Sequence, residues 1–143
     1  LLEQLLDMQR ELKNTPMIQP DLITVVLVGS PNVGKSSIVR AISTGQPEVS
    51  NYPFTTRGMT LGHILDKKSD EKICQVMDTP GLLPRPDEER NEMEQLTLAS
   101  MMHLESVVMF VMDLTGGSGD KSSVAAQLDV RDELRERFGG LLW

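Results

Sequence analysis

Between two apolar stretches the chain reads Gly29-Ser30-Pro31-Asn32-Val33-Gly34-Lys35-Ser36, and this stretch decides the fold. It matches the pattern G-x-x-x-x-G-K-[ST] at every specified position. The segment before it, residues 22–28, is almost continuously aliphatic, as in a strand buried in a parallel sheet. After Gly34 the apolar residues recur at helical spacing, for example at Ile38 and Ile42. A strand, a glycine-containing loop and a helix in this order are the context in which the pattern binds phosphate groups.

The residue types of this loop explain why it suits phosphate. Glycines let backbone N–H groups converge on phosphate oxygens, and the N-terminus of the following helix favours negative charge. Lys35 supplies a point charge for the β- and γ-phosphates, and Ser36 supplies a hydroxyl for Mg²⁺. The alternative is a glycine turn that contains Lys-Ser by chance, which the agreement of motif and context disfavours. We therefore predict nucleotide binding by Gly29, Ser30, Pro31, Asn32, Val33, Gly34, Lys35, Ser36 and Ser37.

A second motif, Asp78-Thr79-Pro80-Gly81, follows at the end of a later apolar run. A carboxylate such as Asp78 can hold Mg²⁺ through water, and Gly81 lets its amide approach a γ-phosphate. Between the two motifs lie Thr55 and Thr56. We select Thr56 as the hydroxyl that completes the metal shell, with two solvated loop threonines as the alternative. The predicted metal ligands are Ser36, Thr56 and Asp78; the predicted catalytic residues are Lys35, Thr56 and Gly81; and Asp78 and Gly81 join the nucleotide-binding set.

The rest of the chain alternates strands with helices. We expect strands at 58–66, 73–77 and 106–112, helices at 89–104 and 121–138, and a loop at 45–57. Residues 1–13 carry one apolar stripe typical of an amphipathic helix, and two prolines make 14–20 a linker. This order predicts a three-layer α/β fold of the P-loop NTPase type with a mostly parallel sheet. The strands at 22–28, 73–77 and 106–112 are expected to be parallel neighbours, with 58–66 as an antiparallel edge strand.

The composition limits the possible functions. The length of 143 residues suits one domain. A net charge of −7 and an aromatic content of 3% make the chain a poor match for a nucleic-acid backbone or for stacked bases. With Cys74 as the sole cysteine, neither a disulfide framework nor a multi-cysteine zinc site is expected. No apolar run approaches the ~20 residues of a membrane-spanning helix, so no membrane partner is expected.

Four stretches, GSPNVGKSS, NYPFTTRGMTLGHI, DTPGLLPRPDEERNEMEQ and FVMDLT, occur in this order and resemble the Obg-like GTPases of the translation-factor class. Within that class, Gly62-His63 and Glu88-Glu89-Arg90-Asn91 resemble the nucleolar GTP-binding (Nog) subfamily. The resemblance implies binding of GTP or GDP with Mg²⁺, ligation of the metal by Ser36 and Thr56, and a nucleotide switch formed by Asp78 and Gly81. It also implies a hydrolase that acts in large ribosomal subunit assembly. Its partner would be that subunit or its precursor, with rRNA and ribosomal proteins, although the acidic charge argues that this segment is not the main RNA-binding surface.

The chain departs from the family pattern where guanine is read. It has no Asn/Thr-Lys-x-Asp motif at the end of a fifth strand, and Lys67-Lys68-Ser69-Asp70 lies in the wrong turn. The sequence stops at Leu141-Leu142-Trp143, where that strand would start. We therefore expect a helix and linker at 1–20, and at 21–143 a GTPase domain that lacks its fifth strand and guanine-specificity motif. The preference for GTP over ATP follows from the resemblance alone.

The residue after Gly81 is Leu82, where Ras-like proteins place a glutamine that orients water. Leucine cannot hydrogen-bond water, so we expect slow hydrolysis unless a partner, a monovalent cation or another loop assists. Asn32 stands where related GTPases with this replacement place a K⁺ ligand, and a loop-stabilising side chain is the alternative. K⁺ is accordingly an optional cofactor beside Mg²⁺.

Several other residues are assigned structural roles. His63 and His103 are too isolated to suggest a metal site or a base, and Cys74 is expected in the core. Arg57 and Arg85 are expected to be solvated loop residues rather than arginine fingers. Five methionines are assigned to the core: Met93, Met101, Met102, Met109 and Met112.

Three functions remain open at this point. The leading hypothesis is a Mg²⁺-dependent GTPase that switches on a pre-ribosomal particle. The alternatives are a catalytically weak placeholder or interaction protein on pre-ribosomes, and an Obg-like signalling GTPase without a ribosomal role. The expected location is the intracellular compartment of ribosome assembly, either the nucleolus or nucleus, or a mitochondrion or plastid.

Overall fold

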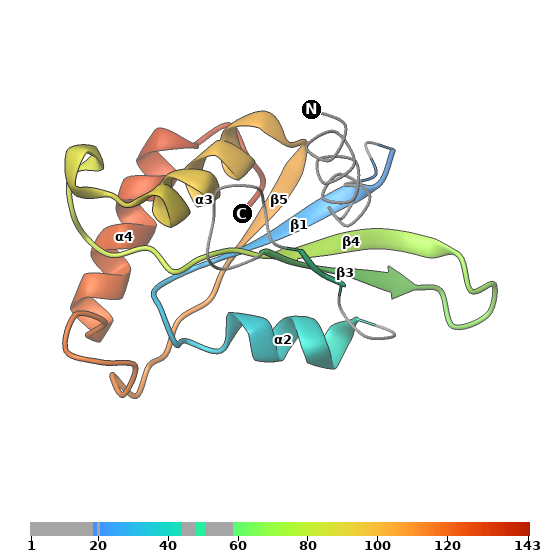
Figure 1. Ribbon diagram of the computed structural model, residues 1–143, viewed down its shortest axis with the longest axis horizontal. Coiled ribbons are helices and arrows are strands. Elements are labelled where there is room, and N and C mark those ends of the chain that lie inside the picture. The colour runs from blue at the N-terminus through green and yellow to red at the C-terminus, as the bar shows by residue number, and fades with distance from the viewer. Residues whose placement is uncertain (1–18, 20, 44–47, 51–58) are drawn as a thin grey trace, which may run out of the picture.

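The computed structural model describes residues 19, 21–43, 48–50 and 59–143. The elements in chain order are β1 (Ile23–Val28), α2 (Lys35–Ile42), β2 (Glu48–Ser50), β3 (Met59–Leu65), β4 (Lys72–Asp78), the 3₁₀ helix η1 (Asp87–Glu89), α3 (Glu92–His103), β5 (Ser106–Phe110) and α4 (Val124–Arg137). The strands form one sheet, with α2 on one side and with α3 and α4 on the other (Figure 1). The described part of the chain has the predicted three-layer architecture of the P-loop fold.

The strands lie in the order β2-β3-β4-β1-β5. β1 pairs in parallel with β4 and with β5, which confirms the three predicted parallel neighbours. β3 runs antiparallel to β4, as predicted. The prediction that β3 is the edge strand is wrong, because β2 pairs antiparallel with its outer side. A loop was predicted at β2, since a strand of three residues is too short to show alternation in the sequence.

Side chains of β1 alternate between the two faces of the sheet. Val26 and Val28 pack in a cluster that includes Leu134 of α4, whereas Leu27 packs with Val39 of α2. Helices therefore cover β1 on both faces, which explains why its sequence is aliphatic at nearly every position. This central strand ends directly at the glycine-containing loop.

Two helices begin later than predicted, and a capping side chain sets each beginning. Asn91 caps α3: its side chain accepts from the Glu94 N–H, and the Glu94 carboxylate accepts from the Asn91 N–H. Glu89, predicted to be in that helix, lies in η1 instead. Ser123 caps α4 by accepting from the Ala126 N–H. Both caps are of residue types that mark helix starts, but apolar periodicity alone does not locate them.

Some predicted core positions are wrong. Met102 and Met109 are 57% and 47% exposed, whereas Met101 is buried as predicted. Met93 and Met112 are half-buried, and so is Cys74. β5 ends at Phe110 rather than at residue 112. Met102 is close to the end of α3, and Met109 lies in β5, the last strand in the sheet order, where an apolar residue need not be covered.

The last residues of the chain return to the sheet. Leu142 forms an isolated parallel bridge with Val107, and its C=O accepts from the Val108 N–H at 2.8 Å. Because β1 occupies the other side of β5, this contact lies on the outer edge of β5. The predicted helix at 1–13 and nearly all of the linker at 14–20 lie outside the described residues. Within the described ranges, no helix is long and apolar enough to cross a membrane.

Candidate functional site

Residues 29–36, the P-loop, connect the end of β1 to the start of α2. Gly34 is the N-cap of α2 and has φ of 98°, a left-handed conformation that glycine adopts without strain. Asn32 also has a positive φ, 61°, which asparagine tolerates better than most residues. The second glycine of the motif is therefore explained by the backbone turn that starts α2.

The Lys35 side chain folds back over the P-loop. Its Nζ donates to the C=O of Gly29 at 3.2 Å and to the C=O of Ser30 at 2.7 Å, and the residue is only 6% exposed. Burial lowers the pKa of the Lys35 ammonium, and the nearby Asp78 carboxylate offsets part of this effect. The buried positive charge is thus held on backbone carbonyls, which are neutral acceptors that a phosphate oxygen can outcompete.

Ser36 and Asp78 come together from different elements. Ser36 lies in the first turn of α2 and Asp78 is the last residue of β4. The Ser36 hydroxyl donates a short hydrogen bond to Oδ2 of Asp78, while Oδ1 is buried and has no hydrogen-bond partner among the described residues. Burial raises the pKa of the Asp78 carboxyl; the Ser36 hydrogen bond and the charges of Lys35 and Arg40 act in the opposite direction.

This pair of oxygen donors fits Mg²⁺. Mg²⁺ is typically bound by one or two protein oxygens, with waters and phosphate oxygens completing its shell. A hydroxyl and a carboxylate that face each other supply such ligands, and a cation would satisfy the buried Oδ1 of Asp78. Ser36 and Asp78 are therefore the described residues that could hold the metal.

The chain after β4 lies against the P-loop. A Cβ on Gly81 would lie 2.4 Å from the backbone nitrogen of Pro31, so the contact requires glycine. The Leu82 N–H donates to the C=O of Gly29 at 3.0 Å, so that this carbonyl accepts from both Leu82 and Lys35. The Leu82 side chain is fully buried in the hydrophobic core rather than directed at the site.

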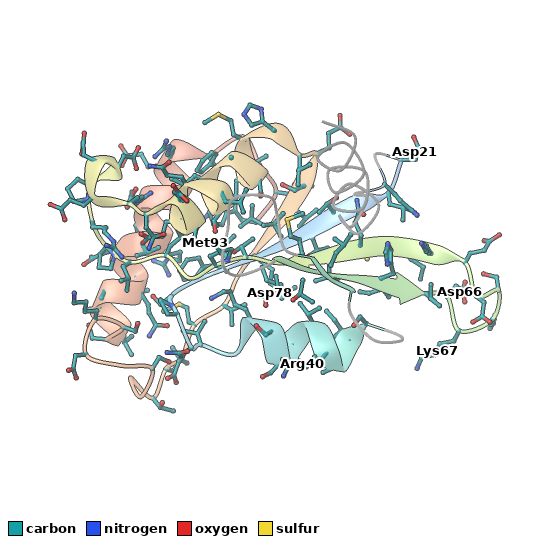
Figure 2. All side chains as sticks on the ribbon, viewed as in Figure 1. Asp21, Arg40, Asp66, Lys67, Asp78 and Met93 are labelled. Atoms are coloured by element: carbon teal, nitrogen blue, oxygen red, sulfur yellow. The ribbon has the colours of Figure 1, made fainter. Side chains whose placement is uncertain are left out.

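A cavity of about 750 Å³ brings the two motifs together. Eight predicted site residues line it: Pro31, Asn32, Gly34, Lys35, Ser36, Ser37, Asp78 and Gly81. Gly29 and Ser30 act instead through the carbonyls that hold Lys35, and Val33 packs against the core beside α2. Figure 2 labels Asp78, above α2, and Met93, at the start of α3, which both line the cavity. Its size is typical of a small-ligand site.

One side of the cavity is formed by residues that the sequence analysis did not select: Leu83, Arg85, Asn91, Met93 and Glu94. Glu94 is 1% exposed, and its Oε1 accepts from the Leu83 N–H at 3.1 Å and from Nε of Arg85 at 3.2 Å. Nη2 of Arg85 lies 3.2 Å from the second carboxylate oxygen. The prediction of a solvated Arg85 is therefore wrong, because a buried carboxylate pairs with it. The Asn91-x-x-Glu94 spacing of a capping box is the sequence signal that could have located Glu94.

Ion pairs attach residues 81–91, which we call the switch segment, to α4. The Arg90 side chain is buried, with Nη2 at 2.7 Å from Oε1 of Glu133 and Nη1 at 3.1 Å from Oδ1 of Asp87. Asp87 also pairs with Arg137 at 2.7 Å. The four charges alternate in sign, so each buried or half-buried group has an opposite neighbour.

The loop after β5 also contacts the P-loop. Asp113 accepts from the Ser118 hydroxyl at 2.6 Å and from the hydroxyl and N–H of Thr115 at 2.6 and 2.9 Å, and these hydrogen bonds lower its pKa to about 2. The Ser118 hydroxyl also lies 3.4 Å from the C=O of Asn32. The buried Gln127 side chain accepts from the Asp113 N–H at 2.7 Å and donates to the Asp113 C=O at 2.9 Å. This ordered neighbour of the P-loop was not identified from the sequence.

Of the other residues named from the sequence, His103 and Lys67 are not among those that line this cavity. Thr55, Thr56 and Arg57 lie outside the described residues. His103 is exposed, and the described ranges contain no group of three or more His, Cys, Asp and Glu side chains that could hold a metal ion. Lys67 lies in the turn between β3 and β4, at the end of the sheet away from Asp78 (Figure 2).

Comparison with known proteins agrees with this geometry. Residues 24–138 match the model of the family described as 50S ribosome-binding GTPase. The chain is 39% identical over 135 residues to nucleolar GTP-binding protein 1 of Encephalitozoon cuniculi, and 37% identical over 113 residues to the protein of that name in Arabidopsis thaliana. These matches cover 93% and 78% of this chain but only 24% and 16% of the two relatives. They confirm the predicted resemblance to nucleolar GTP-binding proteins.

Solved structures show the same relationship. A crystal structure from Plasmodium falciparum, of a protein named as nucleolar GTP-binding protein 1, is 32% identical with a TM-score of 0.66, and the match covers 89% of this chain and 60% of that one. The GDP-bound G-domain of an S. thermophilus FeoB variant is 25% identical with a TM-score of 0.52, over 66% of this chain and 34% of that one. Since the family model covers most of the chain, and its two phosphate-site motifs meet in one cavity, the chain belongs to the 50S ribosome-binding GTPase family.

Proposed function

We propose that the chain binds GTP and GDP with Mg²⁺ and hydrolyses GTP to GDP and phosphate, as the nucleotide switch of a protein that acts in large ribosomal subunit assembly. The observation that carries the proposal is the convergence of Lys35, Ser36 and Asp78, from α2 and β4, on one cavity. Residues 21–143 are proposed to form the nucleotide-binding domain, behind a helix and linker at 1–20. Membership of a GTPase family supports guanine as the base.

Each site residue has a chemical role in this proposal. Lys35 exchanges the carbonyls of Gly29 and Ser30 for oxygens of the β- and γ-phosphates. Ser36 and Asp78, together with Thr56, hold Mg²⁺ directly or through water, and Gly81 offers its N–H to the γ-phosphate. Bound Mg²⁺ neutralises charge that develops on the phosphate oxygens during hydrolysis.

The burial of Leu82 supports the second candidate, a catalytically weak placeholder on pre-ribosomes. A side chain in the core cannot orient the attacking water, so the isolated protein is expected to turn over at about 10⁻⁴–10⁻² s⁻¹ or more slowly. We propose that K⁺ bound beside the phosphates raises the hydrolysis rate by adding positive charge there. Asn32 supports this role because it is one of the residues that line the cavity.

The ribosomal partner is proposed from the names of the family and of the relatives. The net charge of −7 favours contact through a ribosomal protein, or RNA contact through residues outside this segment. The relatives' names favour the nucleolus or nucleus as the compartment, with an organelle as the alternative. An Obg-like signalling GTPase without a ribosomal role is the third possibility, and absence of large-subunit RNA after purification from cells would favour it.

Nucleotide binding is tested by calorimetric titration of the full-length protein with GTP, GDP and ATP, each with Mg²⁺. We expect a preference for guanine nucleotides and a loss of about 100-fold or more in affinity for Lys35→Ala, since the variant removes a charge-assisted contact to two phosphates. Lys68→Ala, in the exposed turn between β3 and β4, is the matched control. An affinity of Lys35→Ala within about tenfold of the original value would contradict the assignment of the P-loop.

Phosphate release, measured with and without large-subunit precursors, separates the enzyme from the placeholder. Stimulation by the precursors supports the switch, whereas background rates in both conditions favour the placeholder.

Replacing Na⁺ by K⁺ should raise the rate of phosphate release, and Asn32→Ala should remove this response without weakening GDP binding. Equal rates in the two salts would eliminate the K⁺ proposal.

A further inference from the structure

The Glu94 carboxylate makes more contacts than capping α3 requires. One capping contact is the Asn91 N–H, which donates to Oε2 of Glu94 at 3.1 Å, and in the other the Glu94 N–H donates to Oδ1 of Asn91 at 3.0 Å. The Leu83 N–H and the Arg85 guanidinium add contacts at 3.1 and 3.2 Å from an earlier part of the chain. A glutamate in a capping box can accept from the N-cap N–H while it remains at the helix surface. Glu94 is instead buried, at 1% exposed.

The additional contacts lead directly to the P-loop. Leu83 follows Leu82, whose N–H is bonded to the C=O of Gly29 and whose side chain is in the core. Gly81, one residue earlier, lies against Pro31. The chain from 81 to 85 is therefore fixed on the P-loop at one end and on Glu94 at the other, along the edge of the cavity.

Charge keeps this arrangement together. A buried carboxylate without a cationic or hydrogen-bonding partner is strongly unfavourable, and here Arg85 supplies the opposite charge. The Arg85 side chain is 29% exposed and lines the cavity, whereas the Glu94 side chain is 2% exposed. Glu94 therefore restrains the position of a cation that borders the phosphate site.

We propose that Glu94 is a positioning residue for GTP hydrolysis, which fixes the Leu83 N–H and the Arg85 guanidinium and so holds the switch segment at the cavity. This inference rests on the proposed GTPase function. In this role Glu94 acts through the two groups that it holds. GDP is held by the P-loop, so loss of Glu94 affects the hydrolytic step more than it affects GDP binding.

The informative variant is Glu94→Gln in the full-length protein. Glutamine has nearly the same shape and keeps one oxygen for the Asn91 N–H, but it has no charge to neutralise Arg85, and its NH₂ group cannot accept from the Leu83 N–H. Glu92→Gln makes the same chemical change at an exposed position of the same helix. Ser123→Ala removes the cap of α4 and serves as the control for loss of stability without a change at the switch segment.

In single-turnover measurements at saturating GTP, we expect Glu94→Gln to lower the rate constant by about tenfold or more, because small misplacements of a reacting site are costly. The Kd for GDP should stay within about threefold of the original value, which is below 1 kcal/mol. Both control variants should keep the original rate. An unchanged rate, an equal loss in Ser123→Ala, or a parallel loss of GDP affinity would overturn the proposal.

Amide hydrogen exchange of the nucleotide-free protein gives a second readout, which needs no hydrolysis. The Leu83 amide should exchange about tenfold faster in Glu94→Gln than in the unchanged protein and in both controls, since its acceptor is weakened. If the unchanged protein releases no phosphate above background, the proposed function fails, and exchange at Leu83 alone decides whether Glu94 positions the segment. Should Glu94→Gln not fold, Arg85→Lys replaces it, because lysine keeps the charge but cannot reach both carboxylate oxygens.

Discussion

The two sides of the cavity are held in different ways. On the P-loop side, Lys35 bonds to the carbonyls of Gly29 and Ser30, which are six and five positions away in the sequence. On the other side, Arg90 of the switch segment pairs with Glu133, 43 positions away, and Asp87 pairs with Arg137, 50 positions away. Backbone carbonyls remain after almost any substitution, whereas a single change removes an ion pair. Apart from changes to Lys35 itself, we therefore expect mutation to affect nucleotide affinity less than it affects the position of the switch segment.

The largest effect is expected at Gly81, where the switch segment contacts the P-loop. In Gly81→Ala the new Cβ would lie 2.4 and 2.5 Å from backbone atoms of Pro31, so the switch segment must move away from the P-loop. We expect a loss of about 3 kcal/mol in the free energy of unfolding and a fall of about 100-fold in the single-turnover rate. Urea unfolding and rapid-quench kinetics measure the two effects.

Gly140→Ala is the matched control, because a Cβ there meets nothing within 4 Å. If Gly81→Ala and Gly140→Ala unfold at the same urea concentration, the close approach of the two sides does not exist in solution.

The next largest effect concerns the ion pairs alone. Glu133→Gln leaves the buried Arg90 guanidinium with only Asp87 as its anionic partner, so we expect a loss of about 1–2 kcal/mol in the free energy of unfolding. The exposed pair between Arg131 and Asp132 provides the control, and Asp132→Asn should cost less than about 0.5 kcal/mol. Urea denaturation checks both variants, and equal costs would remove the distinction between surface and buried charges in α4.

At Asp78 we expect a smaller effect of opposite sign, in which a substitution stabilises the folded protein. Because its pKa is raised in the folded protein, the ionised carboxylate opposes folding at any pH above its ordinary value. Asp78→Asn should therefore raise the melting temperature in Mg²⁺-free buffer at pH 7, by less than Glu133→Gln lowers it. The same variant should lose the stabilisation that Mg²⁺ with GDP gives to the unchanged protein.

Scanning calorimetry with and without Mg²⁺ and GDP decides this prediction, with Asp129→Asn on the exposed side of α4 as the control. A lower melting temperature for Asp78→Asn in the absence of Mg²⁺ would show that the Ser36 hydrogen bond and the charges of Lys35 and Arg40 together outweigh the cost of burial.

The smallest expected effect is at Asp113. Its pKa is lowered from 3.8 to about 2 by hydrogen bonds from Ser118 and Thr115, so its contribution to stability is present above pH 3.8 and is lost as the pH falls through about 2. Asp113→Asn should melt at a lower temperature than the unchanged protein at pH 7, and the difference should shrink as the pH falls below 3.8 and vanish only below about pH 2. Asp120→Asn, in the same loop, is the control, and a difference that does not depend on pH would exclude the carboxylate as its cause.

The P-loop side could be predicted from the sequence because its information is local. A motif of eight residues, an aliphatic strand and a helical repeat are contiguous, and the parallel pairing of β1, β4 and β5 followed from their apolar composition. The convergence of Ser36 and Asp78 was also anticipated, since both follow apolar strands of one sheet.

The switch side could not be predicted in the same way. Nothing in the spacing of Arg90 and Glu133 indicates that these two, among many charged residues, form a pair, because α4 must first dock beside α3. β2 was missed for a related reason: its three residues become a strand only through pairing with β3. Glu94 is the exception, since the capping box with Asn91 is visible in the sequence, although its contacts to Leu83 and Arg85 are not.

The burial of Leu82 also restricts how this protein can evolve. A change to glutamine, the residue that Ras-like enzymes use at this position, would enclose an amide in the hydrophobic core at a cost of about 1–3 kcal/mol, before any water could be oriented. The net stability of a protein is only about 5–15 kcal/mol. Selection would therefore remove such a variant because of its lost folding stability before a faster hydrolysis rate could favour it. Natural variation toward faster turnover is therefore expected at positions that border the cavity, or in a partner, and not at residue 82.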